Sequence, residues 1–260
     1  MKIAISGKGG VGKSTIAAAM ALLWVERGTK VLAVDADPDA NLADALGVST
    51  EARRDIIPIS QRAALIEERT GAKVRQYGQI FKLNPDVSDI ADQYAIDHRG
   101  VALLVLGGIN HAGGGCACPE NVLLRALVTD LVLYRDQALI LDMEAGVEHL
   151  GRATARGVDT LIIVVEPGQR AIDSARRIID LASQIELRRV GLVANKVVDD
   201  SDEAFIRDAM SPWPLLGAIP YSEQIRQADR QGRCILDALD QAVRRRFETV
   251  LTNLEQVIHG

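Results

Sequence analysis

The sequence predicts a doubly wound α/β fold, in which helices flank a mainly parallel, seven- to eight-stranded sheet. Short apolar runs alternate along the chain with amphipathic helical stretches, and 22 glycines suit the many short connections of such a fold. A chain of 260 residues with 48% hydrophobic residues is long enough to bury one core of this kind. We therefore expect a single domain over 1–260, with the irregular stretch 49–99 as a peripheral insertion within it.

The expected elements alternate in chain order. Strands are expected at 2–6, 30–35, 101–106, 138–143, 160–166, 190–195 and 215–219. The clearest helices are expected at 14–27, 120–134, 169–185, 222–231 and 235–258. Ligands bind beyond the carboxyl ends of the strands in such sheets, so the residues just after each strand are the candidates for function.

A glycine-rich loop follows the first strand and has the pattern Gly-x-x-x-x-Gly-Lys-Ser from Gly7 to Ser14. Its glycines let successive backbone N–H groups turn toward phosphates without a Cβ in the way. Lys13 can reach the β- and γ-phosphates and Ser14 can bind Mg²⁺, while the following helix directs its positive end at the same anion. The loop therefore predicts a P-loop NTPase that binds ATP or ADP with Mg²⁺. The residues expected to contact the nucleotide here are Gly9, Gly10, Val11, Gly12, Lys13, Ser14 and Thr15.

Carboxylates follow the strands expected at 30–35 and 138–143. The cluster from Asp35 to Asn41 lies where it could order an attacking water and the Mg²⁺ shell, although a simple turn at Asp37 is the structural alternative. The run ending at Asp142 has the Walker B form, which delivers a carboxylate to Mg²⁺. Gly146, in the switch II segment that follows, could offer its backbone N–H to the γ-phosphate.

Two cysteines, Cys116 and Cys118, follow three consecutive glycines. At this spacing in extended backbone both sulfurs lie on one face and can chelate one soft metal ion. Two thiolates half fill a four-coordinate site, so a two-fold dimer would complete a Cys₄ site for Zn²⁺ or Ni²⁺. The positive end of the helix that begins near Pro119 would favour thiolate. Two small buried residues or a redox pair are the alternatives, and Cys234 is expected to be inert.

Lys8, directly after the first glycine, gives the loop a deviant form. The loop thereby resembles the dimeric ATPases that include MinD, the ParA partition proteins, the nitrogenase iron protein and several metallochaperones. The resemblance implies that Lys8 crosses the dimer interface to the partner's nucleotide, whereas a solvated loop lysine is the alternative. It further implies that Asp37 positions the water or acts as base, and that Asn41 contacts the metal or its water. The residues that it implies for adenine recognition are Asn195, Pro220 and Tyr221.

Three further stretches make the resemblance more specific. The Cys-x-Cys pair followed by Pro-Glu-Asn, the segment 142–150 and the segment 219–221 are similar to those of the CooC and AcsF group of nickel-insertion ATPases. The similarity covers essentially the whole chain. It implies a homodimer that binds Zn²⁺ or Ni²⁺ through both Cys-x-Cys pairs and couples ATP turnover to nickel delivery, with carbon monoxide dehydrogenase or acetyl-CoA synthase as client. His149 is a candidate extra ligand, with a structural role as the alternative.

Two other functions remain open. An iron-protein-like reductase would hold an intersubunit iron–sulfur cluster, but its second cysteine after switch II has no counterpart in 142–152. A positioning ATPase would bind DNA or membrane, whereas 244–246 is the only basic run and the formal net charge is −5. We therefore expect neither a nucleic-acid partner nor a membrane partner. An apolar run of 18 residues is absent, and the loop begins too early for a signal peptide, so a cytoplasmic location is expected.

Overall fold

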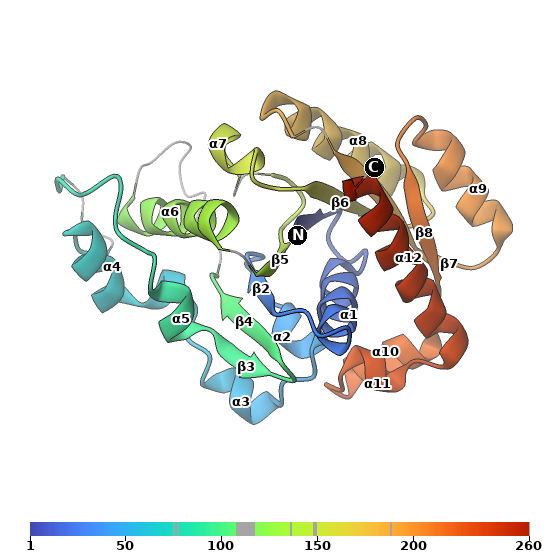
Figure 1. Ribbon diagram of the computed structural model, residues 1–260, viewed down its shortest axis with the longest axis horizontal. Helices are drawn as coiled ribbons and strands as arrows, with labels where there is room; N and C mark the ends of the chain where they lie inside the picture. The colour runs from blue at the N-terminus through green and yellow to red at the C-terminus, as the bar shows by residue number, and fades with distance from the viewer. Residues whose placement is uncertain are drawn as a thin grey trace.

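The structure is a computed structural model that describes residues 1–74, 76, 78–107, 118–135, 137–147, 150–187 and 189–259. Its centre is an eight-stranded sheet in the order β3-β4-β2-β5-β1-β6-β7-β8 (Figure 1). Each pair of neighbouring strands is parallel except β3 with β4, which is antiparallel. The predicted fold class is confirmed.

The strands show why the sheet needs helices on both faces. They are β1 Lys2–Ser6, β2 Val31–Asp35, β3 Ile96–His98, β4 Val101–Val105, β5 Ala138–Asp142, β6 Thr160–Val165, β7 Val190–Val197 and β8 Leu215–Pro220. Along β1, Ile3 and Ile5 belong to one hydrophobic cluster and Ala4 to the other, so both faces of the strand are buried. This explains why the strands are continuous apolar runs in the sequence.

The helices cover both faces of the sheet. In Figure 1, α1 and α12 lie on one side of the sheet, and α6 and α8 lie on the other. The helical elements are α1 Lys13–Glu26, α2 Leu42–Ala45, α3 Thr50–Arg54, the 3₁₀ helix η1 Ile59–Gln61, α4 Ala63–Thr70, α5 Ile90–Tyr94, α6 Pro119–Tyr134, α7 Arg152–Ala155, α8 Gln169–Gln184, α9 Asp200–Ala209, α10 Glu223–Arg230, α11 Ile235–Ala238 and α12 Gln241–His259. Among the described residues, none of these helices is both long and apolar enough to cross a membrane.

Most predicted elements are confirmed to within two residues at each end. The prediction of a single long helix at 235–258 is wrong, because the helix is interrupted between α11 and α12. Leu239 is extended there, and the Asp240 carboxylate accepts a hydrogen bond from the backbone N–H of Val243 at 2.8 Å. That contact starts a new helix in the same way as an N-cap.

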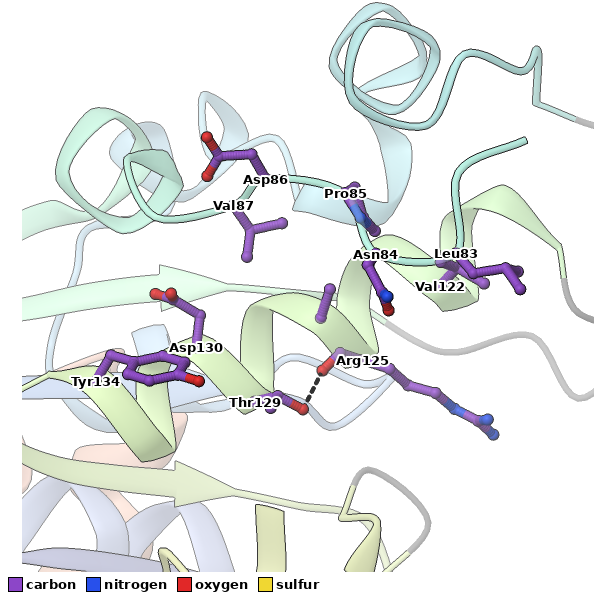
Figure 2. Close-up of a pocket in the computed structure, with 11 residues that line it drawn as sticks. Leu83, Asn84, Pro85, Asp86, Val87, Val122, Arg125, Thr129, Asp130 and Tyr134 are labelled. Carbon is purple, nitrogen blue, oxygen red and sulfur yellow. Dashed lines mark hydrogen bonds between the residues drawn. The ribbon is translucent and has the colours of Figure 1, made fainter. Parts of the chain in front are cut away.

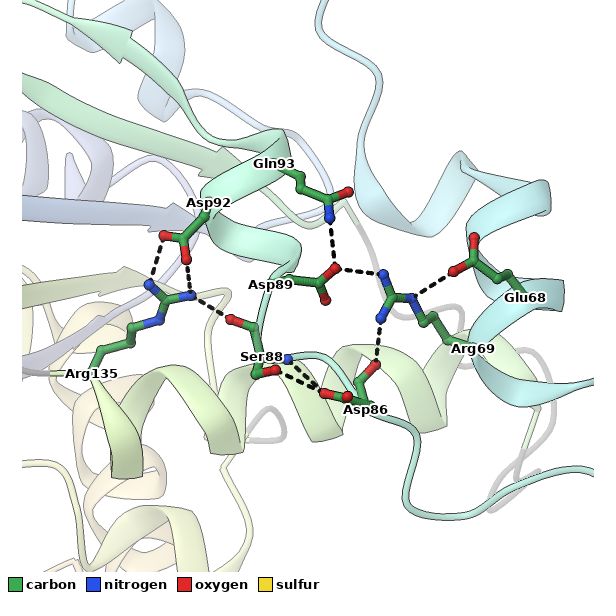
Figure 3. Close-up of polar contacts among 8 residues, drawn as sticks. All are labelled: Glu68, Arg69, Asp86, Ser88, Asp89, Asp92, Gln93 and Arg135. Atoms are coloured by element: carbon green, nitrogen blue, oxygen red, sulfur yellow. Dashed lines mark hydrogen bonds and ion pairs between the residues drawn. The ribbon is translucent and has the colours of Figure 1, made fainter.

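Ion pairs hold the stretch 49–99 together and join it to the end of α6 (Figure 3), and an edge strand joins it to the sheet. Arg69 pairs with Asp89 at 2.7 Å, and Arg135, just beyond α6, pairs with Asp92 at 2.7 Å. The same stretch supplies β3, which pairs antiparallel with β4. Short helices and a three-residue strand leave little periodicity in the sequence, which is why none of these elements was predicted.

Core packing of α12 against β8 gives a direct stability test. Phe247 in α12 is fully buried, so Phe247→Ala should lower the free energy of unfolding by about 3–5 kcal/mol. Phe205 in α9 is 40% exposed, and Phe205→Ala should cost less than about 1 kcal/mol. Urea unfolding of both variants measures the difference, and similar losses in the two would contradict this packing.

Candidate nucleotide-binding site

Glycine geometry shapes the loop between β1 and α1. Gly7, Gly10 and Gly12 have φ values of +154°, +79° and +97°, which other residues rarely adopt. A Cβ on Gly7 would lie 2.5 Å from the carbonyl oxygen of Val164, and one on Gly12 would lie 2.3 Å from the side-chain nitrogen of Asn195. The sequence therefore needs glycine at both ends of the loop, and the loop can present backbone N–H groups to a phosphate.

Lys13 opens α1 as a buried cation beside the carboxylate of Asp37. Its Nζ lies 3.3 Å from Oδ2 of Asp37, and both side chains are almost inaccessible to solvent. Asp35 supports this arrangement, since its carboxylate accepts the backbone N–H groups of Asp37 at 3.2 Å and Leu42 at 2.9 Å. The segment that carries Asp37 is thus folded around the end of β2.

Asp142 ends β5, directly beside Asp35 in the pairing of β2 with β5. It is fully buried, and among the described residues neither of its carboxylate oxygens makes a hydrogen bond of good geometry, although the Ser14 hydroxyl is near enough to lower its pKa. Burial, reinforced by the charge of Asp35, raises the pKa of Asp142 to about 8. Burial likewise raises the pKa of Asp35 to about 7. A buried carboxylate without a partner is costly, and it fits a hard cation such as Mg²⁺ next to Ser14.

Ser6, the last residue of β1, holds the switch II backbone. Its buried Oγ lies 2.8 Å from the carbonyl oxygen of Glu144 and 2.9 Å from that of Gly146, and it accepts the N–H of Gly146 at 3.1 Å. The strand that leads into the P-loop is therefore connected to switch II through one hydroxyl group.

The residues expected to contact adenine lie at the ends of β7 and β8. Asn195 is buried, and its side-chain amide donates to the carbonyl oxygen of Val11 at 2.7 Å. Pro220 is half-buried, whereas Tyr221 is 52% exposed. Asn195 therefore stabilises the P-loop through this hydrogen bond, and its side-chain oxygen is available as an acceptor.

The other predicted nucleotide and magnesium ligands differ in exposure. Ser14 and Thr15 are half-buried in the first turn of α1, directly after Lys13. Asn41 is exposed just before α2, and its side chain does not cap that helix. Asn41 thus lies on the rim of the site rather than among the buried carboxylates.

Lys8 lies on the solvent side of the loop. Its Nζ is 3.4 Å from Oε1 of Glu166, and Lys196 lies 3.4 Å from Oε2 of the same carboxylate. Glu166, Lys196 and Ser6 were not proposed as site residues from the sequence, and Asp35 was included only as the first member of the cluster 35–41. The sequence signal of the other three is that each stands at or next to the end of a strand.

The predicted metal pair is described only in part. Cys116 lies outside the described residues, as does His149. Cys118 is half-buried at the N-cap of α6, with Pro119 as the first helical residue. Burial raises the pKa of the Cys118 thiol and outweighs the backbone N–H of Asn121, which lowers it. The helix end therefore acts on the thiol in the expected direction, but in this single chain burial has the larger effect on its pKa. Among the described residues, no group of three or more His, Cys, Asp or Glu side chains is arranged to hold a metal ion.

A separate groove of about 520 Å³ runs between α6 and the segment 83–87 (Figure 2). It is lined by Leu83, Asn84, Pro85, Asp86, Val87, Val122, Arg125, Ala126, Thr129, Asp130 and Tyr134. The groove contains none of the residues predicted for nucleotide or metal.

The raised pKa of Asp142 predicts a pH-dependent cost of keeping this carboxylate buried. The folded chain holds a proton that the unfolded chain releases, so the free energy of unfolding should fall as pH rises from about 4 to about 8. We therefore compare the free energy of unfolding of Asp142→Asn with that of wild type, without Mg²⁺ and nucleotide. The difference in favour of the variant should be larger at pH 8 than at pH 5, by about 1 kcal/mol or more. Asp39 is exposed, and Asp39→Asn is the control, with no such difference expected in urea unfolding. An Asp142→Asn effect that is equal at both pH values would contradict the assignment.

Comparison with known proteins agrees with this geometry. Residues 2–235 match the family described as CobQ/CobB/MinD/ParA nucleotide binding domain. The chain is 46% identical over 237 residues to carbon monoxide dehydrogenase accessory protein CooC of Rhodospirillum rubrum, covering 91% of this chain and 90% of that protein. It is 44% identical over 238 residues to an uncharacterized ATP-binding protein of Methanocaldococcus jannaschii, covering 90% and 91%.

Solved structures show the same fold. The septum site-determining protein MinD of Pyrococcus horikoshii, complexed with Mg-ADP, has a TM-score of 0.65 at 20% identity, with 98% of this chain and 95% of that chain covered. A putative plasmid partition protein of Borrelia burgdorferi bound to AMPPNP has a TM-score of 0.69 at 18% identity, with 98% of each chain covered. The chain belongs to the CobQ/CobB/MinD/ParA family of nucleotide-binding proteins.

Proposed function

We propose that this protein is an ATPase that acts as a homodimer and helps to insert nickel into carbon monoxide dehydrogenase or acetyl-CoA synthase. The unpartnered carboxylate of Asp142 beside the P-loop carries the nucleotide part of the proposal. Similarity to CooC over 91% of the chain, together with the Cys116 and Cys118 pair, supports the nickel part.

The charges of the site suit a nucleotide with Mg²⁺. Lys13 exchanges Asp37 for the β- and γ-phosphates, while backbone N–H groups of residues 9–15 surround the phosphate chain. Ser14 and Asp142 would hold Mg²⁺, which would supply positive charge against the phosphates.

Release from Lys13 gives Asp37 its role in hydrolysis. Its carboxylate is then free to accept a hydrogen bond from the attacking water and to orient it. Asn41, on the rim, would contact Mg²⁺ or one of its waters. Asp35 keeps its two backbone contacts and holds Asp37 in place.

Recognition of adenine falls to the ends of β7 and β8. Asn195 already donates to the P-loop, so its amide oxygen accepts the exocyclic amine of the base. Pro220 and the half-exposed ring of Tyr221 cover the base from the solvent side.

Dimer formation joins the nucleotide site to the metal. Lys8 reaches across the interface to the partner's nucleotide, where its charge stabilises the leaving phosphates. Cys116 and Cys118 from both chains bind one Ni²⁺ or Zn²⁺ as cargo, and closure around ATP changes its coordination.

Metal stoichiometry tests the cargo role. The purified protein should bind one Ni²⁺ or Zn²⁺ per two chains, and Cys116→Ala with Cys118→Ala should abolish this binding. Metal analysis combined with mass in solution measures both, with and without nucleotide. Cys234→Ser is the control, since Cys234 is a buried free cysteine of the core and its loss should leave the stoichiometry unchanged. Metal binding that persists without Cys116 and Cys118 would contradict the role, and an iron–sulfur chromophore would indicate the reductase instead.

The two lysines of the loop should separate binding from dimer formation. Lys13→Gln should weaken ATP binding by at least about tenfold, because it removes the buried cation of the site. Lys8→Gln should leave ATP affinity of the single chain within about twofold, since Lys8 is 40% exposed, but it should prevent ATP-driven dimerisation. Fluorescence titration and sedimentation velocity measure the two effects. Equal losses of affinity in both variants would contradict separate roles.

A further inference from the structure

Glu166 stands between two lysines at the mouth of the P-loop. It directly follows β6, and its two carboxylate oxygens lie 3.4 Å from Lys8 and 3.4 Å from Lys196 respectively. Opposite charges at this separation attract, even where solvent weakens the interaction. Lys8 is therefore not a freely solvated side chain in this conformation, but is held against its own subunit.

The position of Glu166 is fixed through the P-loop itself. Lys196 also donates to the carbonyl oxygen of Gly10 at 2.6 Å, and the preceding Asn195 donates to that of Val11 at 2.7 Å. The end of β7 thus donates hydrogen bonds to two successive carbonyl groups of the loop. Lys196, which makes one of them, also pairs with Glu166. Glu166 can release Lys8 without losing its second partner.

We propose that Glu166 is a positioning residue that retains Lys8 within its own subunit and so raises the ATP concentration needed for dimerisation. This inference rests on the proposed role of Lys8 across the dimer interface. The partner's triphosphate carries more negative charge than one carboxylate, so it can take Lys8 from Glu166 once the subunits meet. ADP lacks the γ-phosphate and competes less well, which adds selectivity for the triphosphate state.

The size of the effect follows from exposure. The side chains of Lys8 and Glu166 are 40% and 29% exposed, a range in which ion pairs contribute modestly. Glu166→Gln should therefore lower the concentration of a non-hydrolysable ATP analogue at half-maximal dimerisation by about twofold to fivefold. Sedimentation velocity of the full chain measures this shift. The difference from wild type should shrink in 1 M salt, because screening weakens the attraction that the variant removes.

Further variants separate this role from a structural one. ATP affinity of the single chain should stay within about twofold in Glu166→Gln, and the double variant with Lys8→Gln should dimerise no better than Lys8→Gln alone. Glu203 pairs with Arg207 on the surface of α9, so Glu203→Gln is the matched control without effect. Glu166→Ala repeats the test if the Gln side chain retains Lys8 through a hydrogen bond.

The outcomes are distinct. A Glu166→Gln protein that dimerises at the wild-type concentration or above it would overturn the inference, as would an effect that persists without Lys8. A changed ATP affinity of the single chain would place the effect in the P-loop and would also overturn it. Wild-type protein that does not dimerise with the analogue at all would instead refute the proposed dimeric function.

Discussion

The candidate nucleotide site depends on three buried carboxyl groups at one edge of the sheet. Asp35, Asp37 and Asp142 lie close together, and Lys13 pairs with Asp37. The pKa values of Asp35 and Asp142 are raised because burial favours their neutral forms. A nucleotide with Mg²⁺ would complement both kinds of group, since its cation would face the carboxylates and its phosphates would face Lys13. Binding energy at this site therefore comes from electrostatic groups already in place.

The strand order brings these carboxyl groups together. β5 lies between β2 and β1, so Asp142 stands beside Asp35 on one flank, while Ser6 at the end of β1 contacts the segment that follows β5. The carboxyl ends of parallel strands meet at one edge, and residues more than a hundred positions apart become neighbours. The fold thereby connects the P-loop, the carboxylates and switch II with few intervening groups.

Sequence patterns predicted those parts of the molecule that are determined locally. The apolar strands and the P-loop follow from residue type and spacing, as does Asp142 at the end of its strand. The edge strand β3 did not emerge, because three residues carry too little periodicity, and neither did the helix break at Leu239. The contacts of Glu166 with Lys8 and of Ser6 with Gly146 were also missed, since both join segments that are distant in the chain. Such pairings depend on strand order, which composition and spacing leave open.

The same edge of the sheet connects the segment of Asp37 to the strand that precedes the Cys-x-Cys pair in the chain. The backbone N–H of Leu106, just beyond β4, donates to the carbonyl oxygen of Asp35 at 2.8 Å. The side chain of Asp35 in turn holds the segment that carries Asp37. Further along the chain, Cys116 lies outside the described residues, and Cys118 directly precedes α6. Under the proposed function, a change at Asp37 on ATP binding would reach this strand end through Asp35, which contacts both. Under the same proposal, the paired strands β2 and β4 would carry such a change toward the part of the chain that contains the cysteines.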